Sequence, residues 1–328
     1  MRRYYVEQKV KSFAAFLIIL ILLPYIVSVF VNGTDILAGG EEETYVTVKT
    51  KNGHGAEVTG EVGWTEYLAG ILAEEMPETY EPEALKAQAV IIRTNLYREL
   101  EASADKVLTQ EYMTRSEMEK KWSVADFAVY YEKYVRAVEE TDDDVLLYND
   151  SYAWLPYFQA SNGSTRSSAE VLGTEEYPYV AVRECPLDKE ADGEIQLFTF
   201  EYCEVQEACR DFLVAAGGKE QAENGYSFAD FEICSCDSAG YVMQMRIGDT
   251  VCSGDQFRDA LGLPSSCFSL SEQDGKLQIT TTGKGHGLGL SQWTADEMAK
   301  EGKNYAEILR FFYEGTVLNT EIQETSLV

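Results

Sequence analysis

Two neighbouring carboxylates lie at a point in the chain where a helix is expected to end. Glu74 and Glu75 fall within the run YLAGILAEEM, which is predicted to be helical, and Pro77 cannot continue that helix. A carboxylate near the carbonyl end of a helix meets the negative end of the helix dipole. Partial burial would also desolvate it, so its proton affinity should rise. A raised affinity suits a general acid that protonates a glycosidic oxygen, although a glutamate at a helix end is more often simply solvated.

The second candidate segment is GKGHGLGLSQW, residues 283–293, in which four glycines surround His286. Glycines permit backbone conformations closed to other residues and let the main chain approach its neighbours closely. Ser291, Gln292 and Trp293 then begin a predicted helix, where hydroxyl, amide and indole groups could hydrogen-bond to a sugar and stack on it. The same composition fits a tight strand-to-helix turn with His286 packed inside. Composition alone leaves both interpretations open.

Helices and short strands must position these two segments. Residues 45–50 alternate in the manner of a strand. A helix capped by Thr65 is predicted to lead to Glu75, and another is predicted to begin near Pro82, because proline suits the first helical turn. The apolar face of this second helix is expected to consist of Leu85, Ala89, Ile92 and Leu96.

The rest of the chain continues this mixture. Strands are expected at 145–148 and within 195–279. Further helices are expected at 109–141, 205–216, 291–300 and 305–313, the last with Asn304 as its cap. The fold class expected is therefore α+β, a mixed domain with short strands and several helices.

The N-terminus has the features of a membrane anchor. Residues 13–31 contain no charged side chain, and as a helix they would cover about 28 Å, the thickness of the apolar core of a bilayer. Basic residues precede this stretch and acidic residues follow it, which predicts a single-pass protein of the cell membrane with its main domain outside. The alternative is a signal peptide cleaved after the small residues at 37–39. The expected parts are a cytoplasmic tail (1–12), a transmembrane helix (13–31), a linker (32–43), an extracytoplasmic domain (44–320) and a C-terminal tail (321–328).

Composition excludes several classes of function. The 328 residues carry a formal net charge of −29 and no basic stripe, so nucleic acid is not expected as a partner. The seven cysteines are an odd number, so at least one thiol should be free or paired between chains. With His54 and His286 as the only histidines, zinc-finger and HExxH sites lack ligands. A cysteine-nucleophile enzyme is disfavoured, because no cysteine has a recognisable nucleophile context.

The two segments together resemble the stage II sporulation protein D family. Its members carry an AxEMP…ALKAQAVAART-like block and, far downstream, a GxGHGxGxSQxGA-like block, which are matched here by AEEMPETYEPEALKAQAVIIRT and GKGHGLGLSQW. The likeness continues in the family's order through AVEETDDDVLLYND, YPYVAV, LGLPSSCFSL and NYAEILRFFYEGT. It therefore covers most of residues 61–318, and agreement over so many blocks is not expected by chance.

The resemblance implies a lytic transglycosylase that works outside the membrane during engulfment of the forespore. Its substrate would be peptidoglycan strands from which an amidase has removed the stem peptides. In the family the glutamate of the EMP triplet is the catalytic acid and base, a position held here by Glu75. The residues expected to bind substrate are Arg93, Gln159, Ser161, His286, Ser291 and Gln292. The implied partners are glycan strands, an amidase and membrane proteins of the engulfment machinery.

One loop departs from the family pattern. The family usually has a sequence like YFHSTSGGRTESS where this chain has YFQASNGSTRSS, so Gln159 stands at the expected histidine. Some family members are thought to hold zinc through that histidine and nearby cysteines. Because glutamine is a poor zinc ligand and Cys185 is the nearest cysteine, no metal and no other cofactor are predicted. The same change supports an alternative function, a non-catalytic glycan-binding scaffold or amidase enhancer.

Overall fold

The computed structural model describes residues 44–51, 57–216 and 226–320. The helix expected at 13–31 and the two predicted tails lie outside these residues, and so does His54. No helix within the described ranges is long and apolar enough to cross a membrane. Helices and short strands alternate along the described chain, as expected for the α+β class.

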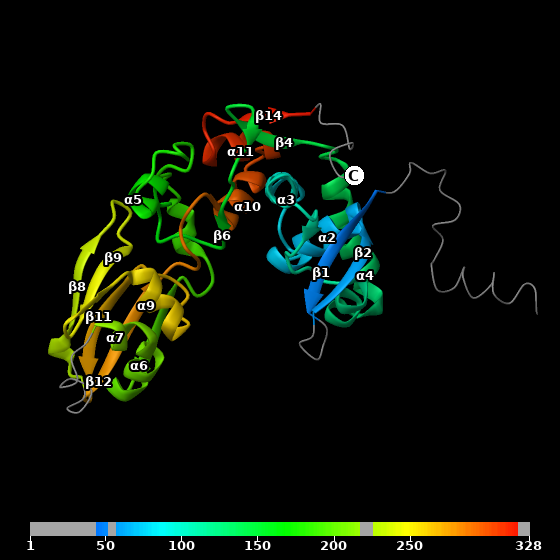
Figure 1. The fold of residues 1–328 in the computed structure, drawn as a ribbon. Helices are drawn as coiled ribbons and strands as arrows, with labels where there is room; N and C mark the ends of the chain where they lie inside the picture. Colours follow the sequence, from blue (N-terminus) through cyan, green and yellow to red (C-terminus); the bar gives the residue numbers. More distant parts are fainter. Residues whose placement is uncertain (1–43, 52–56, 217–225, 321–328) are drawn as a thin grey trace, which may run out of the picture. The chain divides into compact units, whose positions relative to one another are not determined.

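Long helices belong to the first half of the described chain and shorter ones to the second half (Figure 1). The α-helices are α2 (Trp64–Glu75), α3 (Pro82–Ala102), α4 (Arg115–Glu139), α5 (Ser168–Leu172), α6 (Tyr202–Ala208), α7 (Arg210–Ala216), α9 (Gly254–Leu261), α10 (Gln292–Lys300) and α11 (Tyr305–Phe312). Two short 3-10 helices are η2 (Pro186–Glu190) and η3 (Phe228–Asp230).

The strands are short and form several small sheets. They are β1 (Tyr45–Lys51), β2 (Glu57–Gly63), β3 (Val107–Leu108), β4 (Val145–Tyr148), β5 (Ser151–Tyr152), β6 (Tyr157–Phe158), β7 (Ile195–Phe200), β8 (Phe231–Cys236), β9 (Val242–Ile247), β10 (Thr250–Cys252), β11 (Phe268–Gln273), β12 (Lys276–Thr282), β13 (Leu290–Ser291) and β14 (Val317–Asn319).

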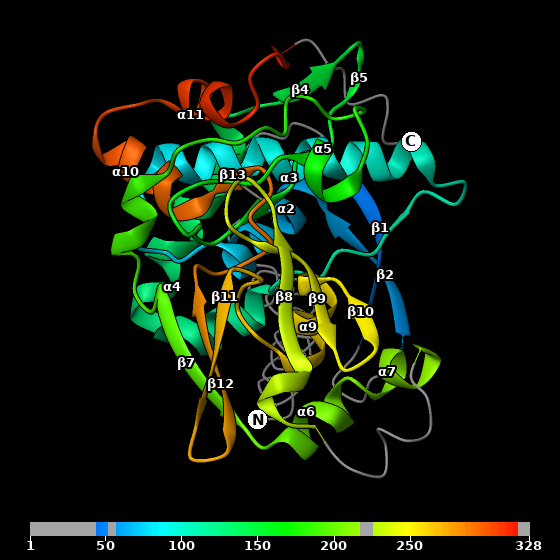
Figure 2. The ribbon, with the colours of Figure 1, turned by 90° about the vertical axis from the view of Figure 1, so that its left-hand side faces the viewer.

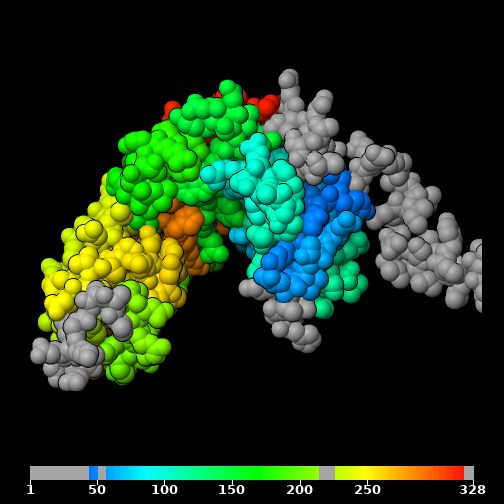
Figure 3. Space-filling view, in the orientation of Figure 1, coloured from blue at the N-terminus to red at the C-terminus, as the bar shows by residue number. Residues whose placement is uncertain are grey.

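The first hydrophobic core gathers around α3, the long cyan helix in Figure 2. The predicted apolar face of this helix is confirmed, since Leu85, Ala89, Ile92 and Leu96 are each at most 1% exposed. The helix packs against α2, α4, α10 and α11. The sheets β2-β1-β3 and β14-β4-β5 complete this part, and the residues of the paired strands β1 and β2 form the blue surface in Figure 3. Helix α3 thus contacts both the helix that carries Glu75 and the two helices that follow the glycine segment.

The second hydrophobic core lies between the sheets β10-β9-β8 and β11-β12-β7. Strand β12 alternates in burial along its length, with Leu277 and Ile279 fully buried, as expected for a strand with one face toward a core. Helix α9 packs against β9, and its Phe257 side chain is buried in the same core. The strands expected between 195 and 279 therefore build a core of their own.

Two predicted helix starts are confirmed and one cap is wrong. α3 begins at Pro82, and the Asn304 side chain caps α11. α2 begins at Trp64 with Gly63 at the N-cap, and no side chain caps it. Thr65 therefore lies inside the first turn and is not the cap.

The helix expected at 109–141 is shorter than predicted and is kinked. It begins at Arg115, because Thr114 and Glu117 form a reciprocal capping box at that point. Ser123 has a φ of 69°, which the regular helix does not allow, so two helices meet there. The amphipathic pattern of the segment continues through both the cap and the kink. Periodicity alone therefore predicts too long a helix.

Candidate active site

α2 ends at Glu75, as the sequence predicts, because Met76 adopts an extended conformation. The Tyr134 hydroxyl donates to the Met76 carbonyl oxygen at 2.8 Å and holds this end of the helix. The Glu75 side chain is half-buried, whereas Glu74 is exposed. Desolvation raises the pKa of the Glu75 carboxyl, a hydrogen bond from Tyr157 opposes the rise, and the charge of Glu74 adds to it. The raised proton affinity expected at this position is confirmed, with burial as its main cause.

Tyr157 contacts the Glu75 carboxyl, although the sequence gave no reason to single it out. Its hydroxyl hydrogen-bonds to Glu75 and accepts a hydrogen bond from Gln110 Nε2 at 3.4 Å. Gln110 is held in turn by the Tyr67 hydroxyl, which donates to its backbone carbonyl at 2.9 Å. Burial and the charge of Glu75 raise the pKa of the Tyr157 hydroxyl, so this group stays protonated. Glu75 therefore has a fixed donor that orients its carboxylate.

The glycine segment positions Tyr157 through a parallel pairing of β13 with β6, in which Leu290 lies opposite Tyr157. The Leu290 N–H donates to the Pro156 carbonyl oxygen at 3.1 Å. The Tyr313 hydroxyl donates to the same oxygen at 2.5 Å. At Gly289, where φ is +78°, a Cβ atom would lie 1.8 Å from this oxygen, so only glycine fits. Glycine at this position is therefore required for the contact that holds β6, the strand that carries Tyr157.

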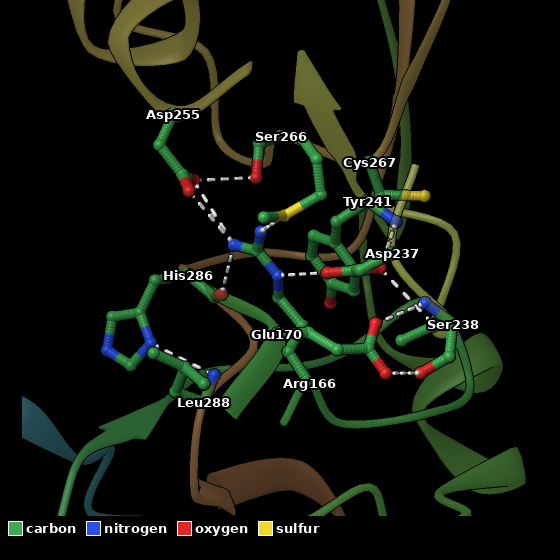
Figure 4. Close-up of polar contacts among 12 residues, drawn as sticks. Arg166, Glu170, Asp237, Ser238, Tyr241, Asp255, Ser266, Cys267, His286 and Leu288 are labelled. Atoms are coloured by element: carbon green, nitrogen blue, oxygen red, sulfur yellow. Dashed lines mark hydrogen bonds and ion pairs between the residues drawn. The ribbon is translucent and has the colours of Figure 1, made fainter. Parts of the chain in front are cut away.

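His286 is half-buried in this turn, so its ring packs against the protein and also keeps part of its surface exposed. Both interpretations left open by composition therefore stand. The Nδ1 atom of His286 accepts a hydrogen bond from the Leu288 N–H at 3.0 Å (Figure 4), and the ring also hydrogen-bonds to the backbone of Tyr157. The Phe158 ring lies 5.8 Å away, centroid to centroid. Burial, aided by the nearby charge of Arg258, lowers the pKa of the imidazole to about 4. The ring is therefore neutral near pH 7 and holds the main chain of Tyr157.

Asp188 joins the loop after β6 to the start of α10, and sequence reasoning missed it. Its Oδ2 accepts hydrogen bonds from the Ser161 N–H at 2.6 Å and the Ser161 hydroxyl at 2.5 Å. Its Oδ1 accepts from the hydroxyls of Ser291 at 2.8 Å and Thr294 at 2.6 Å. Desolvation raises the pKa of this fully buried carboxyl, whereas the four donors lower it. An aspartate in a short 3-10 helix carries no sequence signal for such a role.

Four residues expected to bind substrate are enclosed by the protein, which corrects that expectation: Arg93, Ser161, Ser291 and Gln292. Arg93 is 1% exposed, and its guanidinium donates to the carbonyl oxygens of Val138 at 2.9 Å and Asp144 at 3.1 Å. The two serines are 0% exposed and bonded to Asp188, as described above. Gln292 is 2% exposed, and its Nε2 donates to Gln88 Oε1 at 3.5 Å. Ser161 and Ser291 thus support the site through Asp188, whereas Arg93 joins α3 to the end of α4 and to the residue before β4.

Gln159 keeps an exposed side chain, while its carbonyl oxygen accepts a hydrogen bond from the Trp293 N–H at 3.0 Å. It therefore remains available to a substrate. The zinc held by some family members does not fit the residues here, because Gln159 offers only a neutral amide. Burial also raises the pKa of the Cys185 thiol to about 12, which disfavours the thiolate that zinc requires. Across the described ranges, no group of three or more His, Cys, Asp or Glu side chains is placed to hold a metal ion.

A cavity of about 440 Å³ lies beside the end of α2. Its volume is within the range of roughly 300–1,000 Å³ typical of ligand pockets. The cavity is lined by Thr50, Glu74, Glu111, Tyr112, Met113, Thr114, Glu117 and Lys121. The exposed neighbour of Glu75 thus faces a space large enough to hold part of a ligand.

Comparison with known proteins relates about three quarters of the chain to sporulation proteins. A family model described as stage II sporulation protein matches residues 52–148. The chain is 31% identical over 265 residues to "Stage II sporulation protein D" of Bacillus subtilis (strain 168), which covers 77% of this chain and 74% of that protein. It is 31% identical over 261 residues to the protein of the same name from Bacillus amyloliquefaciens, with coverages of 76% and 72%. It is 24% identical over 297 residues to "Amidase enhancer" of Bacillus subtilis (strain 168), with coverages of 77% and 40%.

Proposed function

Because the chain belongs to the stage II sporulation protein D family, we propose that it is a lytic transglycosylase with Glu75 as its single acid and base. The substrate would be peptidoglycan glycan strands from which the stem peptides have been removed. The observation that carries this proposal is the half-buried Glu75 carboxyl, whose pKa is raised by desolvation and whose position is set by Tyr157. A carboxylic acid that keeps its proton to higher pH is suited to protonating a leaving oxygen.

One glutamate can perform both proton transfers of this reaction. Protonated Glu75 gives its proton to the glycosidic oxygen as the bond from that oxygen to the anomeric carbon breaks. The 6-hydroxyl of the N-acetylmuramic acid residue attacks the anomeric carbon and loses its proton to the Glu75 carboxylate, which leaves a 1,6-anhydro ring. The reaction needs neither an activated water nor a second carboxylate, in contrast to most glycosidases. Tyr157 would stabilise the carboxylate formed between the two transfers by its hydrogen bond.

The site of action follows from the same proposal. Residues 13–31 would anchor the chain in the cell membrane as a single pass, with the catalytic domain outside the cytoplasm. An amidase that strips the stem peptides would act before it on the same strands, and membrane proteins of the engulfment machinery would be further partners.

A second candidate function is a non-catalytic glycan-binding scaffold that stimulates an amidase. Two observations favour it: the distant relative named "Amidase enhancer", and Gln159 in place of the histidine usual in the family. Under this hypothesis the protein would bind glycan strands without cutting them.

The deciding experiment is incubation of the purified protein with peptide-free glycan strands, followed by mass spectrometry of the products. The proposal predicts 1,6-anhydro ends that increase with time and that are absent with Glu75→Gln. Products with reducing, hydrolysed ends would contradict the lytic mechanism. Binding of strands by both proteins without any cleavage would favour the scaffold.

A further inference from the structure

Arg166 places a fully enclosed guanidinium between the two hydrophobic cores. The side chain is 1% exposed and lies at the centre of the cluster in Figure 4. Its Nε donates to Asp237 Oδ2 at 2.6 Å, and its Nη1 donates to Asp255 Oδ2 at 3.1 Å. The Tyr241 ring lies beneath the guanidinium, 4.8 Å from ring centroid to Cζ. An arginine with so many fixed contacts has a single orientation, because its planar fork matches two carboxylates and a ring at once.

Both carboxylates belong to the second core. Asp237 directly follows β8, is 1% exposed, and its Oδ1 accepts from the N–H groups of Ala239 and Tyr241 at 3.1 and 2.8 Å. Asp255 is on α9 and also accepts from the Ser266 hydroxyl at 2.7 Å. Each carboxylate that binds Arg166 is therefore also held through its Oδ1 atom by a second donor from this part of the chain.

The main chain of Arg166, by contrast, is bonded to the glycine segment, residues 283–293. Its N–H donates to the Gly287 carbonyl oxygen at 2.7 Å, and Arg166 and Leu288 form a parallel bridge. Its Nη1 also donates to the His286 carbonyl oxygen at 3.1 Å. A Cβ atom at Gly287 would lie 2.8 Å from both the Arg166 Cδ and the Tyr241 Cζ, so these two side chains pack closely against the glycine. Arg166 thus binds two consecutive carbonyl oxygens of the glycine segment, that of His286 through its guanidinium and that of Gly287 through its backbone N–H.

The contacts continue from Arg166 to Glu75. Arg166 pairs with Leu288, and Leu290 pairs with Tyr157 where β13 meets β6. The His286 ring lies 5.8 Å from the Phe158 ring, centroid to centroid, and hydrogen-bonds to the backbone of Tyr157, whose hydroxyl hydrogen-bonds to the Glu75 carboxyl. We propose that Arg166 is a positioning residue, through which Asp237 and Asp255 of the second core fix His286 and Tyr157 and hence the Glu75 carboxyl. The catalytic part of this inference rests on the proposed function. The geometric part, the coupling of Arg166 to the His286 ring, does not.

The geometric part is testable without activity, because the chain contains two histidines. Full-length protein with ¹⁵N-labelled histidine gives ring signals that report the tautomer and hydrogen bonds of each imidazole, and His286→Asn identifies which set belongs to His286. Arg166→Lys keeps the charge but cannot form the forked contacts. We expect this substitution, and Asp237→Asn as a second variant, to change the His286 ring signals. Arg246→Gln is the matched control, since Arg246 pairs with Glu232 on the exposed side of the same sheet.

The catalytic part is tested by cleavage of peptide-free glycan strands. Misplacement of an acid by a fraction of an ångström should lower kcat by roughly tenfold or more in Arg166→Lys, while KM stays within about twofold. Unchanged His286 signals in both variants would overturn the inference, and so would changed signals with the parent's kcat. Changed signals together with a parent protein that cleaves nothing would support the geometric coupling and overturn the proposed function instead.

Discussion

The Glu75→Gln substitution tests the proton transfer proposed for the site while leaving the structure of the site in place. Glutamine keeps the size of the side chain and a carbonyl oxygen that can accept the hydrogen bond from Tyr157, but it has no proton to give at any accessible pH. Because Glu75 is half-buried and its surroundings favour the neutral form, an uncharged amide should fit there at least as well as the carboxylate. The substitution should therefore leave the fold and the affinity for glycan strands close to those of the parent.

The size of the effect follows from the two roles proposed for this carboxyl. General acid and base assistance is typically worth about 10²–10⁴-fold, so kcat should fall by at least that factor. At about 1.36 kcal/mol per tenfold change, this loss corresponds to roughly 2.7–5.4 kcal/mol of transition-state stabilisation. The stability of the Glu75→Gln protein, unlike its activity, should not fall. A carboxyl whose pKa is raised in the folded state contributes stability below its unfolded pKa and loses it as pH rises through its folded pKa, so the glutamine variant should unfold at an equal or higher temperature near pH 7.

The assay is the initial rate of formation of 1,6-anhydro ends, with thermal unfolding recorded for each protein. Glu74→Gln is the comparison variant. Glu74 lines the neighbouring cavity, but its side chain points about 100° away around the helix, so this change should cost much less activity than Glu75→Gln. A Glu75→Gln protein that cleaves as fast as the parent refutes the assignment. Equal losses in the two variants would show that the charge of the pair matters, and not the proton of Glu75.

Three further outcomes follow from the geometry. Tyr157→Phe removes the hydrogen bond that lowers the pKa of Glu75, so the loss of activity with rising pH should move to higher pH in the pH–rate profile, and an unmoved limb would contradict this. Gly289→Ala should lower the unfolding free energy by at least about 1–3 kcal/mol in urea. Gly302→Ala, where φ is +89° and an added Cβ would meet nothing within 4 Å, should cost less, because a Cβ at Gly289 would also lie 1.8 Å from the Pro156 carbonyl oxygen. Dialysed protein should contain far less than one zinc per chain by metal analysis and should keep its activity in chelator, because Gln159 cannot replace the family histidine; stoichiometric zinc would refute this.

The position of Glu75 could be predicted because its causes are local. Pro77 cannot continue a helix, and Pro82 suits the first turn of the next one, so the sequence defines the helix end within a few residues. The half-buried setting of Glu75 follows from the apolar run that precedes it in α2. The same holds for the start of α11, where Asn304 and Glu307 form a capping box that needs no distant partner.

The partners of Glu75 could not be predicted, because they arrive through pairings between distant segments. Tyr157 reaches the carboxyl only because β6 pairs with β13, which nothing in the composition around Tyr157 indicates. Asp188 receives the Ser291 hydroxyl from 103 residues away. Thr65 is not the cap of α2, although its residue type suits that role, because Gly63 occupies the N-cap position.

Burial decides which polar residues of the site can meet a substrate, and residue type does not report burial. Ser291 and Gln159 both carry groups that could bind a sugar, yet the Ser291 hydroxyl is enclosed and bonded to Asp188 while the Gln159 side chain is exposed. Since the enclosed hydroxyl can act only through Asp188 and the helix it caps, its removal would alter the support of the site and not a contact with the strand. Under the proposed function, differences in glycan recognition would therefore come from exposed residues of the site, such as Gln159, at which this chain departs from the family pattern.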